Sequence, residues 1–209
     1  MPETLTAAAV LLVAGPLIGL AGFYDTGLYR VWAASRDEHL ATVGAHRRGW
    51  IALNVAFVVA TVATIAGLTL LTTASGSSGG SMAFLVLATT CYAVGGLLWC
   101  AVCAIRMRTT PQLATMVASG RPTEPGESLI GAASGGLFAA FSILVGLAFV
   151  WFGVGSALGS VVPAIVAWGV AGFGVLVVAW YVRAGDIIPA VVYVPTLVVG
   201  VALLMGGVP

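Results

Sequence analysis

The chain has 209 residues, of which 60% are hydrophobic and only 7% are charged, and its mean hydropathy is +1.11. These values lie far outside the range of soluble globular domains, so they predict a membrane protein. The formal net charge of +1 excludes the basic surface that nucleic-acid binding requires. Because nearly all of the chain is needed to form membrane spans, a soluble catalytic domain cannot be accommodated.

Six apolar segments are each long enough to cross a bilayer as a helix, for which about 20 residues are needed. Gly, Ser or charged residues separate these segments. We therefore predict an all-α, polytopic membrane protein in which residues 1–209 form a single bundle of six transmembrane helices. The predicted spans are Leu5 to Tyr24, Trp50 to Leu71, Ala83 to Ile105, Leu129 to Phe152, Val161 to Val182, and Ile187 to Leu204.

Every basic residue of the chain is an arginine, and all eight fall in connections between spans. Four lie between the first and second spans, three between the third and fourth, and one between the fifth and sixth. Short loops rich in positive charge stay in the cytoplasm, so we expect both termini to lie outside. The absence of lysine beside abundant Ala, Val and Gly is typical of high-GC bacterial genomes, so the expected location is the bacterial cytoplasmic membrane.

Prolines and small residues indicate how the spans would pack. Pro16 in the first span, and Pro189 and Pro195 in the last, predict kinks that could frame a cavity. Small residues four apart let two helices approach closely in a membrane, and we expect each such pair to be an intramolecular helix contact. These pairs are Gly15 and Gly19, Gly131 and Gly135, Gly155 and Gly159, and Ala167 and Ala171.

The most polar part of the chain is residues 24–48, between the first two spans. No Pro or Gly interrupts residues 28–43, so we expect the first helix to continue past the membrane surface toward Leu40. His39 and His46 are seven residues apart, and on a continuous helix they would share a face.

The middle of every predicted span lacks ionisable residues, and the two external turns carry no charge. Convergent polar groups are therefore expected only at the inner end of the bundle. The candidate ligand-binding residues there are Asp25, Arg30, His39, His46, Arg47 and Asn54. With only two histidines in the chain, we predict no metal site and no haem, and we assign no other cofactor and no catalytic residue. The alternative interpretation is that these residues form a solvated topology signal.

Three functions remain open. The first is binding or transport of a small uncharged or weakly polar solute, which the kinked outer spans and the lack of buried charge favour. The second is an accessory or scaffolding subunit of a larger membrane complex, which the shortage of polar groups within the spans favours. The third is a membrane enzyme with a site at the inner surface. The expected partners are the lipid bilayer and either other membrane proteins or further copies of the chain.

Overall fold

The computed structural model describes residues 3–25, 28, 34–121 and 125–206. Every regular element in this part of the chain is a helix, and six helices are long and apolar enough to cross a membrane. The prediction of an all-α protein with six transmembrane helices is therefore confirmed, and the chain is an integral membrane protein. The elements are α1 (Glu3–Asp25), α2 (Arg36–Ala45), α3 (Arg47–Ala74), α4 (Gly79–Ala118), α5 (Pro125–Gly159), α6 (Ala164–Ala184), the 3-10 helix η2 (Pro189–Val192) and α7 (Tyr193–Gly206).

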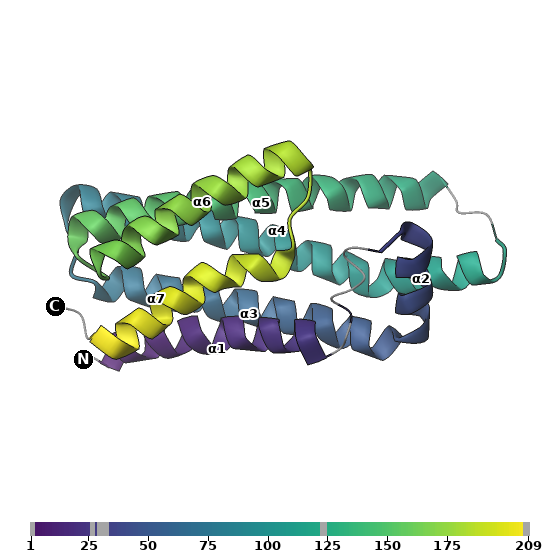
Figure 1. The fold of residues 1–209 in the computed structure, drawn as a ribbon, viewed down its shortest axis with the longest axis horizontal. Helices are drawn as coiled ribbons and strands as arrows, with labels where there is room; N and C mark the ends of the chain where they lie inside the picture. The colour runs from purple at the N-terminus through teal and green to yellow at the C-terminus, as the bar shows by residue number, and fades with distance from the viewer. Residues whose placement is uncertain (1–2, 26–27, 29–33, 122–124, 207–209) are drawn as a thin grey trace.

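The six spanning helices form an open ring. Helix α7, which η2 precedes, packs on α1, α1 on α3, α3 on α4, α4 on α5, and α5 on α6. The ring would close where α6 meets α7, but these two helices barely touch, although they are consecutive in the chain (Figure 1). We call the open line between α6 and the η2–α7 pair the seam.

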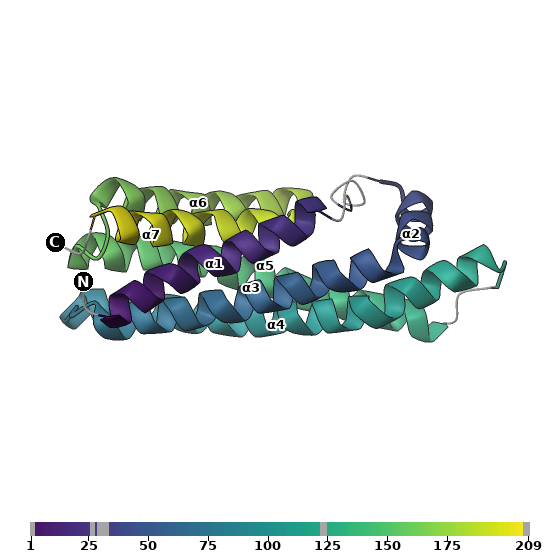
Figure 2. The same ribbon diagram turned by 90° about the horizontal axis from the view of Figure 1, so that it is seen from below.

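The two ends of the bundle differ in charge and in length. Both termini lie at one end (Figure 1), and the described arginines lie toward the opposite end, which we call the arginine end. Helix α6, with 21 residues, is about 31 Å long and matches the hydrocarbon core of a bilayer. Helix α4, with 40 residues, is about 60 Å long and cannot fit within that core. Figure 2 shows α2, α4 and α5 extending past α1 and α6 at the arginine end.

Glycine contacts hold the expected helix pairs together at three of the four small-residue motifs. A Cβ atom on Gly15 would lie 3.0 Å from the carbonyl oxygen of Ala60, so α1 packs closely on α3. Gly155 faces Leu85 of α4, and Gly153 fits between Ala167 and Ala171 of α6. These contacts confirm that small residues determine where the helices meet.

The expected helix contact at Gly131 and Gly135 is wrong. A Cβ atom on either residue would meet no atom of a described residue within 4 Å. Both residues instead line a cavity of about 320 Å³ between α4 and α5. The pair lies near the N-terminus of α5, on the side of the arginine end, where the two helices leave this space between them.

The expectation of one continuous helix from the first span to Leu40 is also wrong. Helix α1 ends at Asp25, and Ser35 has a ψ of 160°, which is not helical. Ser35 begins α2 through a capping box, in which its hydroxyl accepts from the Glu38 N–H and the Glu38 carboxylate accepts from the Ser35 N–H. Residues 26–27 and 29–33 of the expected helix lie outside the described part of the chain.

The orientation expected from the arginines can be tested at the two ends of α4. Ser78 and Ser119 are exposed residues that flank this helix, so a cysteine at either position should leave the fold intact. A membrane-impermeant maleimide applied to intact cells should label the Ser78→Cys variant and leave Ser119→Cys unlabelled until the membrane is permeabilised. The unmodified chain gives the background from Cys91, Cys100 and Cys103. Labelling in the reverse order would show that the termini face the cytoplasm.

The packing of α5 on α6 predicts a difference between two glycines. A methyl group on Gly153 would collide with the Ala167 carbonyl oxygen and lie 2.7 Å from the Ala171 nitrogen, and neither backbone atom can move independently. Gly153→Ala should therefore lower the free energy of unfolding by about 1 to 3 kcal/mol. Gly172→Ala, on an open face of α6, should not destabilise the protein. Unfolding of the purified protein in mixed detergent micelles measures both changes, and equal stability of the two variants would contradict the close packing.

Candidate functional site

The structure separates the sequence-predicted site residues into three groups. Arg30 lies outside the described part of the chain, and Asp25 is the last residue of α1, with a side chain that is not described. Arg47 is exposed at the start of α3. His46 is exposed between α2 and α3, where the helix direction changes, and its Nδ1 lies 3.2 Å from the Thr42 carbonyl oxygen. The two histidines therefore do not lie on one continuous helix.

His39 and Asn54 each contact Trp50. The imidazole of His39 meets the Trp50 indole edge-on, with ring centroids 5.4 Å apart. The amide of Asn54 is buried and donates to the Trp50 carbonyl oxygen at 2.8 Å, within its own helix. Trp50 in turn donates from its indole nitrogen to the Arg106 carbonyl oxygen of α4 at 3.0 Å. This arrangement ties α2, α3 and α4 together at the arginine end.

Aromatic side chains fill the centre of the ring. Trp99 stacks on Phe141 of α5 with centroids 5.1 Å apart, and it also contacts Phe57 of α3. The Tyr193 hydroxyl lies 2.9 Å from the Thr61 hydroxyl and donates to the Phe57 carbonyl oxygen. A cavity between the spanning helices near Tyr92 and Phe149 is only about 10 Å³. In the part of the chain that the structure describes, the centre is therefore packed and offers no polar passage between the two ends.

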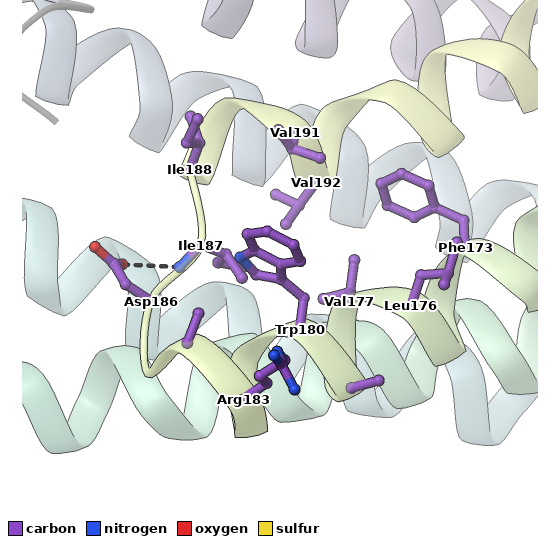
Figure 3. A pocket seen from close by; sticks show the side chains of 12 residues that line it. Phe173, Leu176, Val177, Trp180, Arg183, Asp186, Ile187, Ile188, Val191 and Val192 are labelled. Carbon is purple, nitrogen blue, oxygen red and sulfur yellow. Dashed lines mark hydrogen bonds between the residues drawn. The ribbon is translucent and has the colours of Figure 1, made fainter. Parts of the chain in front are cut away.

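A cavity of about 680 Å³ lies in the seam. Its walls come from the second half of α6, the connection that follows and η2, and they are almost entirely apolar. In Figure 3 the Trp180 indole lies between α6 and η2, with Ile187 and Val192 beside it. Among the described residues that line it, the charged ones are Arg183 and Asp186, both at the arginine end of the cavity.

The connection between α6 and η2 explains why this cavity exists. Gly185 ends α6 in the left-handed conformation, with a φ of 72°, and its N–H donates to the Tyr181 carbonyl oxygen. Asp186 then accepts from the Ile187 N–H at 2.8 Å, and Pro189 begins the 3-10 helix. This sharp turn directs the chain away from α6 before α7 begins. The prolines of the last span, which the sequence analysis interpreted as kinks, thus lie at the start of its helices.

A second cavity of about 260 Å³ continues the seam toward the end with the termini. Phe173 lines both seam cavities, so they adjoin at this ring. Pro195 of α7 lines both the second cavity and the cavity of about 10 Å³, and separates them. The seam is therefore apolar along the length of α6, and its charged groups are confined to one end.

Comparison with known protein families, with curated proteins and with solved structures gave no match.

Sequence reasoning did not find the seam cavity. Its lining consists of residues that any lipid-facing helix contains, and its existence depends on how far α6 and α7 stand apart. Two sequence signals do point to it: Trp180 at the end of a span beside Arg183, and Gly185 followed by Pro189 before the last span. From the sequence alone, the arginine indicates topology and the prolines indicate kinks.

Proposed function

We propose that this membrane protein binds an uncharged or weakly polar, lipid-soluble molecule in the seam between α6 and the η2–α7 pair. The apolar part of the ligand would lie against Trp180 and Phe173, and its polar end would lie at Arg183 and Asp186. The observation that carries the proposal is the 680 Å³ cavity with apolar walls and charge at one end only.

The size and chemistry of the cavity support a ligand of this class. Small-molecule sites have volumes of about 300 to 1,000 Å³ and are lined mainly by apolar and aromatic side chains, with a few polar groups that fix orientation. Trp180 is 63% exposed and Leu176 is 68% exposed in the protein alone. An elongated molecule lying along α6 would cover both side chains.

The route into the site also favours a molecule that is already dissolved in the membrane. The centre of the ring is closed by Trp99, Phe57 and Tyr193, whereas the seam lies on the outside of the bundle. A ligand could enter the seam from the hydrocarbon core without crossing the packed centre. This geometry fits binding of such a molecule better than passage of a water-soluble solute through the ring.

A subunit role is the second candidate, because α6 is the least buried of the six spans. Ile165 is 84% exposed and Trp168 is 57% exposed on this helix. A helix of another membrane protein could cover this face and the seam together. The candidate inner-surface site at Asp25, Arg30, His39, His46, Arg47 and Asn54 stays a separate prediction, and so does an enzymatic role for it.

A photoreactive fatty alcohol tests the seam directly, because it is uncharged, weakly polar and soluble in the bilayer. The protein is placed in nanodiscs, the diazirine-bearing alcohol is photolysed, and the labelled peptides are identified by mass spectrometry. Labelling of residues 173–192 should saturate and should be displaced by an excess of the non-photoreactive alcohol. Trp180→Ala should weaken this labelling severalfold, because the ligand would lose its van der Waals contacts with the indole ring.

Trp168→Ala is the matched control, since this exposed tryptophan lies on the same helix outside the 680 Å³ cavity. Its labelling should equal that of the unchanged protein, as should that of His39→Ala and His46→Ala. Labelling that stays unsaturated and equal on all lipid-facing helices would contradict the binding site. A stoichiometric foreign subunit that blocks labelling of residues 173–192 would support the subunit role instead.

A further inference from the structure

Arg106 has an environment that its role as a topology signal does not explain. It is partly buried, and its guanidinium carbon lies 5.5 Å from the ring centroids of both Trp99 and Phe138. Among the described residues, no Asp or Glu carboxylate lies within ion-pair distance of this guanidinium, and the Asp186 carboxylate acts on it only from farther away. Stacking on aromatic rings stabilises a cation only in part, and a charge removed from water generally requires an opposite charge.

The cavity of about 320 Å³ between α4 and α5 adjoins this cation. Arg106 lines the cavity together with three side chains that can donate hydrogen bonds, namely Thr110 and Gln112 of α4 and Ser134 of α5. Among the described residues, none of these three side chains forms a hydrogen bond with another protein group. The described part of the lining therefore offers one cation and several donors, and no acidic residue is among the described lining residues.

The wall of the cavity on α5 is made by glycines that do not pack against another helix. Gly131 and Gly135 have the spacing of a helix contact, yet each has open space where a side chain would be. Gly95 and Gly155, in contrast, both fit closely between α4 and α5 nearer the other end. Gly131 and Gly135 thus leave space beside the Arg106 guanidinium and do not pack against a described residue of another helix.

The position of Arg106 along α4 corresponds to the headgroup layer of a bilayer. Arg106 follows Gly79, the first residue of α4, by 27 residues, which is about 40 Å of helix. A bilayer with its headgroups is about 40 to 45 Å thick. If α4 begins near one membrane surface, Arg106 lies among the headgroups at the other, where the anionic groups of lipids are concentrated.

We propose that this cavity binds the phosphate group of an anionic phospholipid from the leaflet at the arginine end. Arg106 supplies the cation, with two or more N–H groups directed at the phosphate oxygens, and Thr110, Gln112 and Ser134 supply neutral donors. The site is distinct from the seam and does not depend on a ligand there.

Thermal unfolding in a neutral detergent tests the proposal, with phosphatidylglycerol as the probe and tryptophan fluorescence as the readout. Phosphatidylglycerol should raise the midpoint temperature with a saturating dependence on its concentration, because it binds the folded state. Gly131→Leu fills the cavity and keeps Arg106, so about tenfold more lipid should be needed for the same shift. Gly136→Leu is the matched control: this neighbouring glycine also has open space for a side chain but does not line the cavity, so it should respond like the unchanged protein.

Arg106→Gln should lose the response to phosphatidylglycerol to the same extent as Gly131→Leu. If Arg106→Gln does not fold, the comparison of Gly131→Leu with Gly136→Leu still decides whether the cavity binds the lipid. An equal lipid dependence in Gly131→Leu and Gly136→Leu would overturn the site. An equal shift with phosphatidylcholine would overturn the role of net negative charge, and an equal shift with inorganic phosphate would overturn the assignment to a lipid. Trp180→Ala should respond normally, which separates this site from the seam.

Discussion

Close approach of helices at glycine is the constraint on which the rest of the structure depends. Gly174 of α6 lies against Gly146 of α5, and Gly200 of α7 lies against Leu12 of α1. Each of the two helices that border the seam is thus held by a neighbour on its far side. Because lipid gives no hydrophobic force that would draw α6 and α7 together, these contacts are enough to leave the seam open. The short turn at Gly185 joins the two helices without closing the space between them.

The membrane environment also determines how the polar side chains within the spans form hydrogen bonds. Within the spans, Thr61, Thr64, Ser142 and Asn54 each donate to a carbonyl oxygen of their own helix four residues earlier. Such bonds satisfy a buried donor without creating a polar path through the membrane. Other hydroxyls join one spanning helix to another: Tyr193 joins α7 to α3, Thr72 and Thr89 join α3 to α4, and Ser81 donates to the Gly155 carbonyl oxygen of α5. Both proposed sites have their charged groups at the arginine end.

The number of spans could be predicted from the sequence. A long apolar segment crosses a bilayer as an α-helix, because this satisfies all of its backbone hydrogen bonds within the segment. It was less reliable where two interpretations fit the same residues. The segment before Leu40 lacks Gly and Pro and looked like a continuous helix, but Ser35 with Glu38 three residues later is also a capping box, and this local signal decided the structure. Gly131 and Gly135 matched a packing motif, but the motif is a contact only if a partner helix is close.

The candidate sites were harder to predict than the spans, for a related reason. Among the predicted residues, His39 and Asn54 each contact Trp50, the first through the indole ring and the second through the backbone carbonyl oxygen, and the sequence identifies Trp50 only as the start of the second span. Cavities depend on the distances between helices, and neither the seam nor the space beside Arg106 has a signature in residue spacing. In both cases an arginine that the sequence places in a connection between spans also lines a cavity in the structure. These arginines are Arg183 in the seam and Arg106 between α4 and α5.

Both proposed sites are connected through α5 at the arginine end. The guanidinium of Arg106 lies over Phe138, and Phe138 meets the ring of Tyr181 edge-on with centroids 6.4 Å apart. The carbonyl of Tyr181 accepts the hydrogen bond from Gly185 that ends α6 and shapes the mouth of the seam. Contact alone does not transmit an effect, since coupling requires an element with two arrangements that both sites influence. The turn at Gly185 and Asp186 is the part of this path that lies outside a helix. A change in the backbone of this turn would alter the distance between α6 and η2.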